Sequence, residues 1–72
     1  MATEVEAQIT GSVWKIEKAV GDPVAEGDEI LILESMKMEI PVESPCSGRI
    51  SEIRVSEGDQ VEEGAVLAVV GS

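Results

Sequence analysis

The residues that could do chemistry lie together in one hexapeptide, Glu34–Glu39, at the middle of the 72-residue chain. It reads Glu-Ser-Met-Lys-Met-Glu, so the amine of Lys37 stands between two methionines, and two carboxylates bracket the group. Methionine offers soft, polarizable surface that adapts to different partners. The amine is either an ordinary solvated charge on a turn or a group displayed for attachment, and the rest of the chain decides between these interpretations.

Most other catalytic chemistry is excluded by composition. The chain has no histidine, so it has no Ser-His or Cys-His pair and no imidazole ligand for a metal. Its one cysteine, Cys46, cannot form an internal disulfide. We expect this thiol to be a small apolar filler and not a nucleophile. The chain is therefore expected to be no enzyme, and no metal site is expected.

The charge balance excludes two classes of partner. Fifteen acidic and five basic residues give a net charge of −10, which repels phosphate backbones and anionic lipid. The longest apolar run, Ala65–Val70, is too short to cross a bilayer. Residues Met1–Val5 lack the basic start and apolar core of a signal peptide. We expect a cytoplasmic monomer that binds neither nucleic acid nor membranes.

An internal repeat organises the whole chain. With an offset of 37, residues 1–35 align without a gap on residues 38–72. Identical residues meet at Gly11 and Gly48, Gly21 and Gly58, Val24 and Val61, and Gly27 and Gly64. Only Met36 and Lys37 have no counterpart. We therefore expect one domain, 1–72, made of two repeats that together present these two residues.

Apolar and polar residues alternate with a period of two, which predicts strands, and no stretch has a helical period. The expected strands cover residues 3–9, 12–18, 29–34, 38–43, 49–55, 60–62 and 65–70, with a very short one near Val24. Alternation breaks between Val13 and Ile16 and again between Ile50 and Ile53, which predicts a β-bulge in each half. Pro41 lacks a backbone N–H and predicts an edge strand.

Neither repeat could bury its apolar face alone, so each is expected to cover the other. The fold class is all-β, a sandwich of two four-stranded halves with pseudo-twofold symmetry. The midpoint of the chain then forms a hairpin tip at Met36 and Lys37, with the lysine held out in solvent. Two-residue hairpins favour Asn-Gly, and Met-Lys in its place costs on the order of 1–3 kcal/mol.

Parity along residues 38–43 predicts how the flanking side chains point. Met38 shares the inward parity of this strand and is expected to be partly buried, whereas Glu39 is expected to face outward. For Met36, core packing and recognition remain equal alternatives. Trp14, the only aromatic residue, is expected to be a buried anchor.

The hexapeptide resembles the acceptor motif of biotinyl carrier domains, whose core is Ala-Met-Lys-Met or a close variant. The likeness covers essentially the whole chain, because the repeated glycines and valines match the positions of the family on both sides of Lys37. The chain is thus identified as a member of the biotin/lipoyl attachment family. This resemblance implies a flattened antiparallel barrel or sandwich, the barrel-sandwich hybrid, with the modified lysine at a hairpin tip.

The resemblance also implies a function. A biotin protein ligase would attach biotin to Lys37, and the product would carry carboxyl groups between the active sites of a biotin-dependent carboxylase. The implied partners are the ligase and the biotin carboxylase and carboxyltransferase components. Candidates for ligase recognition are the neighbours of the lysine: Glu34, Ser35, Met36, Met38 and Glu39.

Two departures from the family pattern leave alternatives open. Ser35 stands where biotinyl motifs have Ala, and lipoyl acceptors often carry Thr or Ser there, so lipoate and a lipoate ligase remain an alternative for acyl or aminomethyl transfer. The gap-free repeat leaves no room for the protruding loop of some acetyl-CoA carboxylase carriers. An unmodified β-sandwich that docks a partner through its methionine-rich tip is the further alternative.

Overall fold

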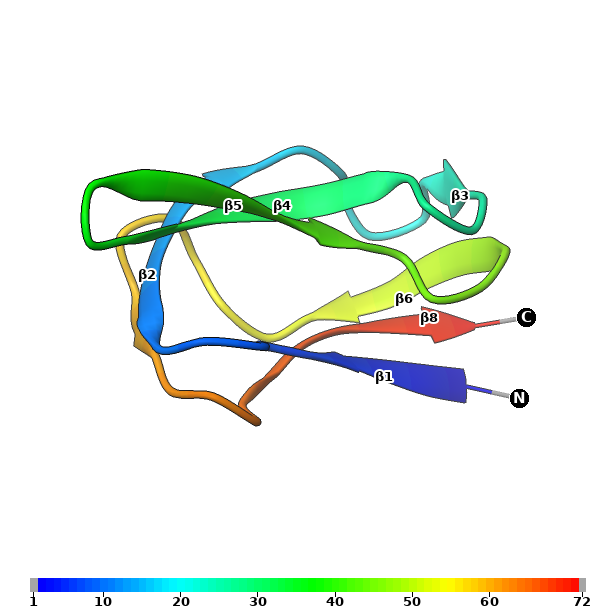
Figure 1. Ribbon diagram of the computed structural model, residues 1–72. Coiled ribbons are helices and arrows are strands. Elements are labelled where there is room, and N and C mark those ends of the chain that lie inside the picture. Colours follow the sequence, from blue (N-terminus) through cyan, green and yellow to red (C-terminus); the bar gives the residue numbers. More distant parts are fainter. Residues whose placement is uncertain (1, 72) are drawn as a thin grey trace.

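The computed structural model describes residues 2–71, and these form eight strands and no helix. The strands are β1 (Ala2–Glu6), β2 (Gly11–Ile16), β3 (Pro23–Val24), β4 (Glu29–Ser35), β5 (Met38–Glu43), β6 (Gly48–Ile53), β7 (Gln60–Val61) and β8 (Val66–Gly71). Figure 1 shows β4 and β5 in one layer, above β6, β8 and β1.

Each layer is a four-stranded antiparallel sheet that takes two strands from each repeat. One sheet has the order β1-β8-β6-β3 and holds both chain ends, so we call it the terminal sheet. The other has the order β5-β4-β2-β7 and is called the hairpin sheet. The 37-residue offset relates β1 to β5, β2 to β6, β3 to β7 and β4 to β8, so it converts one sheet order into the other. The expected all-β, pseudo-twofold fold is confirmed.

The core lies between the sheets and obeys the same symmetry. Ile30 and its counterpart Leu67 are both fully buried, as are Leu33 and its counterpart Val70. Burying one such side chain contributes about 1.5–3 kcal/mol. Both repeats therefore supply equivalent parts of one apolar interior.

The two predicted β-bulges are confirmed. The register shifts between Val13 and Lys15 in β2 and between Ile50 and Glu52 in β6, which are positions related by the repeat. In each case one extra residue enters the strand, so that an inward-facing residue is followed by two exposed ones.

The first bulge corrects the expectation for Trp14. The indole is 47% exposed and is not a buried anchor. Val13 points into the core, and the extra residue of the bulge turns both Trp14 and Lys15 outward. Its counterpart Ser51 is exposed as well, so the backbone and not the aromatic side chain determines this position.

A second pair of bulges was not predicted. The register also shifts between Val5 and Glu6 against β8, and between Glu29 and Leu31 against β5. The extra residues are Leu67 in β8 and Ile30 in β4, and each is buried together with the residue that follows it. The regular strand β1 also ends at Glu6 instead of residue 9, although the N–H of Ala7 still donates to the carbonyl of Ala65 at 2.9 Å.

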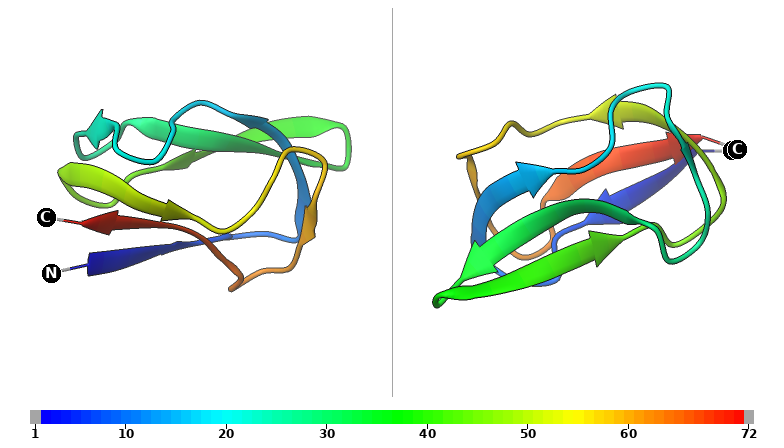
Figure 2. Two further views of the ribbon diagram at one scale, coloured as in Figure 1. Left: turned by 180° about the vertical axis from the view of Figure 1, so that it is seen from behind. Right: turned by 90° about the horizontal axis from the view of Figure 1, so that it is seen from above.

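The molecule is elongated, with extents of 33 × 17 × 17 Å. The β4–β5 hairpin reaches one end of the long axis, and both chain ends lie at the other end (Figures 1 and 2). There Ala2 is paired with Gly71. Within residues 2–71, no helix is long and apolar enough to span a membrane.

Candidate functional site at the hairpin tip

The β4–β5 hairpin turns in two residues. Ser35 pairs with Met38 as the last cross-strand pair, which leaves Met36 and Lys37 as the loop. Their φ angles are 52° and 65°. Positive φ at both central residues is the pattern of a type I′ turn, whose twist matches that of the flanking strands. The predicted tip is therefore confirmed, with both of its residues in the left-handed region.

The tip is a strained position on a well-supported base. Left-handed backbone at a residue other than glycine costs on the order of 1–3 kcal/mol, and such strain persists only where the surroundings enforce it. Here β4 is paired on both sides, with β5 and with β2. The backbone of β2 approaches so closely that a Cβ on Gly11 would lie 2.6 Å from the carbonyl oxygen of Glu34. A side chain at position 11 would therefore collide with the base of the hairpin.

Both residues of the tip extend into solvent, and so does the residue after it. Met36 is 93% exposed, and Lys37 is exposed too. Met38 is 61% exposed, so the prediction of its partial burial is wrong. Burial along β5 decreases from Val42, which is buried, through Ile40, which is half-buried, to Met38. The inward parity is correct, but the hairpin extends past the edge of the opposite sheet and nothing covers its last residue.

The amine of Lys37 forms no ion pair with the described residues around it. Glu34 and Glu39 are exposed, Glu39 as expected from its parity, and they lie directly opposite each other in the β4–β5 register. Ser35 is half-buried at the end of β4. Among residues 2–71 the ion pairs are those of Lys15 and Arg54, and none involves Lys37. The side chain of Lys37 is therefore exposed and has no ionic partner among these residues.

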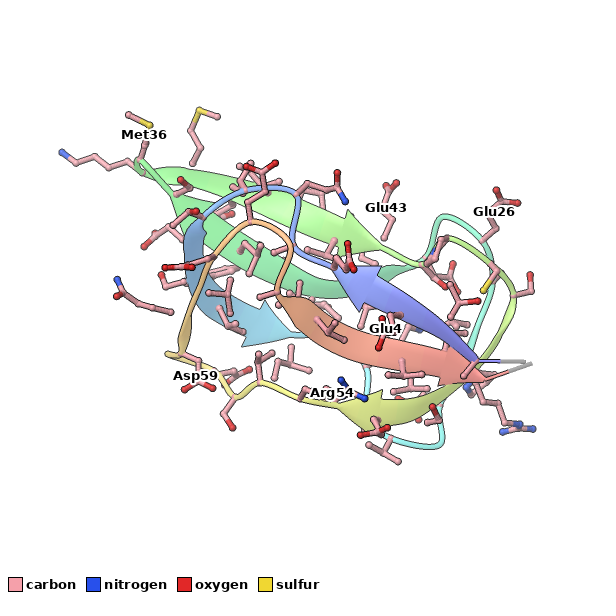
Figure 3. All side chains as sticks on the ribbon, turned by 90° about the horizontal axis from the view of Figure 1, so that it is seen from below. Glu4, Glu26, Met36, Glu43, Arg54 and Asp59 are labelled. Atoms are coloured by element: carbon pink, nitrogen blue, oxygen red, sulfur yellow. The ribbon has the colours of Figure 1, made fainter. Side chains whose placement is uncertain are left out.

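Sequence reasoning missed a segment that packs beside the hairpin sheet. The N–H of Gly58 donates to the carbonyl of Val13 at 2.7 Å, and the N–H of Val13 donates to the carbonyl of Asp59 at 2.7 Å. Asp59 and Met36 lie toward the same end of the molecule in Figure 3. The Glu57 carboxylate accepts a hydrogen bond from the N–H of Ile16 at 3.0 Å. The repeat could have indicated this segment. Glu57 carries a charge where the aligned residue of the other repeat, Val20, carries none.

No group of three or more His, Cys, Asp or Glu residues within the described part of the chain could hold a metal ion. The site consists of one solvent-exposed amine, that of Lys37, with the adaptable thioether side chains of Met36 and Met38 on both sides. Such a tip can be covalently modified by another protein.

The family model described as "Biotin-requiring enzyme" (Biotin_lipoyl) matches residues 1–70. The chain belongs to the biotin/lipoyl attachment family. Domains of this family are carriers, so the chain is a biotin/lipoyl carrier domain.

Two relatives of similar length support this membership. The biotin/lipoyl attachment protein of Bacillus subtilis (strain 168) is 48% identical over 63 residues, which cover 88% of this chain and 86% of that protein. The "Biotinylated protein TB7.3 homolog" of Mycobacterium leprae (strain TN) is 43% identical over 70 residues, which cover 97% of this chain and 99% of that protein.

A solved structure supports the fold. The crystal structure of Kluyveromyces lactis urea carboxylase superposes with a TM-score of 0.94 and 39% sequence identity. The match covers 99% of this chain but only 6% of the urea carboxylase chain. This biotin/lipoyl domain therefore resembles one small segment of a much larger carboxylase.

Proposed function

We propose that this protein is a biotin carrier whose cofactor is joined to Lys37. The observation that carries the proposal is the tip itself. A strained two-residue turn holds one unpaired amine in solvent, with an exposed methionine on each side. A turn selected for stability alone would favour Asn-Gly at these positions, so the Met-Lys pair points to a role in recognition by a modifying enzyme.

The modification would proceed by acyl transfer on a biotin protein ligase. The deprotonated amine of Lys37 attacks the acyl carbon of biotinyl-adenylate, so that a C–N bond forms and the bond from the acyl carbon to the phosphate oxygen breaks. AMP leaves and the nitrogen loses a proton, which gives an amide. Because the chain has no histidine, the base must come from the ligase or from solvent.

The biotinylated domain would act as a mobile arm between the biotin carboxylase and carboxyltransferase components of a carboxylase. The likeness to urea carboxylase supports a role of this class. The cofactor supplies the chemistry and the protein supplies its position. Tethering raises the concentration of the biotin ring near each active site without any additional contact.

Intact mass after incubation with a biotin protein ligase, ATP and biotin tests the proposal. We expect the mass of one biotinyl group on the wild type and on Lys18→Arg, and none on Lys37→Arg. Lys18→Arg is the matched control because it removes a different amine and keeps the charge. Unmodified wild type, or an adduct that persists in Lys37→Arg, would disprove the assignment.

Lipoate is the second candidate. Ser35 favours it, because lipoyl acceptors often have Ser or Thr two residues before the lysine. The name of the B. subtilis relative covers both cofactors. The same protein incubated with a lipoate ligase, ATP and lipoate answers the question by its different mass shift. Under the lipoate proposal, Met36→Asp should increase lipoylation relative to biotinylation, and an unchanged ratio would count against it.

A further inference from the structure

An apolar patch lies on the outer face of the hairpin sheet, behind the tip. Ile32 of β4 is directly opposite Pro41 of β5 on one side and Lys15 of β2 on the other, so these side chains share one face. Trp14, the extra residue of the β2 bulge, immediately precedes Lys15 and is exposed as well. Pro41 is exposed and Ile32 is half-buried. We call Trp14, Ile32 and Pro41 the indole patch.

The repeat supplies an internal control for this patch. On the outer face of the terminal sheet, the equivalent residues are Ser51, Val69 and Glu4. There the Arg54 guanidinium reaches Glu4 at 3.9 Å and Glu52 at 3.4 Å, and Figure 3 shows Arg54 near Glu4. At two of the three positions the same scaffold therefore folds with polar residues, whereas Val69, like Ile32, is apolar. Trp14 and Pro41 are thus not a requirement of the fold.

Apart from Lys15, which pairs with Glu17 at 3.6 Å, the charges around the patch are acidic. Glu34 and Glu39 form a cross-strand pair toward the tip, and Glu57 bonds to the backbone of β2 two residues after Trp14. The repeat-related positions carry no charge; they are Gly71, Ala2 and Val20. These three carboxylates, which we call the acidic rim, are thus specific to the hairpin sheet.

The patch is close to the amine. Val13, the neighbour of Trp14, pairs with Leu33, which is four residues before Lys37. Leu33 lies two residues before Ser35, the last strand residue before the tip, so at about 3.3 Å per residue the indole patch begins about 7 Å behind the base of the tip. An enzyme that accepts the tip into its active site would also reach the face that carries Trp14.

We propose that the indole patch and its acidic rim are a docking surface for the ligase that modifies Lys37, which should present an apolar recess flanked by Lys or Arg side chains. This inference rests on the proposed function. Exposed tryptophan is a frequent centre of binding energy in interfaces. A carboxylate rim accelerates encounter with a basic surface and weakens association between two copies of this acidic chain.

Steady-state biotinylation of Trp14→Ser tests the surface, because serine is the residue that the other repeat places there. We expect KM for the carrier to rise by about tenfold or more, with kcat within about twofold of the wild type. Val20→Ser is the matched control, because it removes a 62% exposed apolar side chain at a position outside the patch, and should leave KM unchanged. Raising the ionic strength should increase KM for the wild type, because it screens the rim.

A second variant tests whether a higher KM comes from loss of the surface or from misfolding of the protein. Pro41→Glu installs the residue found at the equivalent position of β1, on an exposed edge strand, and should also raise KM with little change in the denaturation midpoint. Unchanged KM in both variants, with the wild type fully biotinylated, would overturn the docking surface and leave the proposed function intact. Failure to biotinylate the wild type would overturn both. A wild-type dimer that Trp14→Ser dissociates would assign the patch to a second copy instead.

Discussion

The two ends of this molecule consist of equivalent strands. One end carries Lys37, and the other holds the first and last strands of the chain. At one end β4 and β5 are joined through Met36 and Lys37. At the other end their repeat counterparts β8 and β1 are paired from Ala2 and Gly71 onward, with the chain ends in place of a loop. The bulges and the buried side chains match between the halves.

The two ends differ in a two-residue insertion and in a few side chains. The lysine end has two additional residues in strained backbone, the acidic rim and the indole patch. The core beneath both ends is equivalent. A duplicated scaffold of this kind separates the residues that stabilise the fold from those that serve recognition, because any residue that only stabilises is expected in both copies.

The largest effect tests whether the core is equivalent in the two halves. Ile30→Ala and Leu67→Ala remove repeat-related side chains that are both fully buried. Each is expected to lower the free energy of unfolding by about 3 kcal/mol, because a cavity remains where the side chain was. Urea denaturation measures both losses, and a difference above about 1.5 kcal/mol would break the equivalence.

A smaller effect on stability is expected at Gly11 and Gly48, and only one of these two positions should also affect the rate of biotinylation. Gly11→Ala and Gly48→Ala both introduce a Cβ that collides with a backbone carbonyl, that of Glu34 and that of Gly71 respectively. We expect each to cost about 1–3 kcal/mol of stability. Only Gly11→Ala disturbs the base of the hairpin, so it alone should slow biotinylation of the folded protein. Equal modification rates would show that the hairpin base does not position the lysine.

Strain at the tip predicts a gain in stability. Met36→Asn keeps Lys37 and places at φ 52° a residue that tolerates left-handed backbone. We expect it to raise the free energy of unfolding by about 1 kcal/mol while lowering the rate of biotinylation. Met38→Asn, in a strand, should give no such gain. Greater stability with an unchanged modification rate would remove Met36 from the recognition residues.

The smallest effect concerns the like charges across the hairpin. Glu34 and Glu39 face each other directly, which is destabilising. Glu39→Lys should therefore stabilise the protein by about 0.5 kcal/mol at low ionic strength, and the gain should vanish in high salt. A gain that persists in high salt would show that repulsion is not its cause.

The sequence alone predicted most of the architecture, because the 37-residue repeat and the period-two pattern are direct consequences of the sandwich. It placed Lys37 at a two-residue tip and found one pair of bulges. It was wrong about Met38 and Trp14, since parity gives the direction of a side chain but not whether anything covers it. It also missed Glu57, whose place beside β2 depends on contacts between residues 41 positions apart.

The most direct test of the account is a peptide map, by mass spectrometry, of the protein purified from the cells that make it. We expect a biotinyl group on the peptide that contains Lys37, and no adduct on Lys15 or Lys18. An unmodified Lys37, or a cofactor on either of the other two lysines, would contradict the claim that the duplicated scaffold exists to present this one amine.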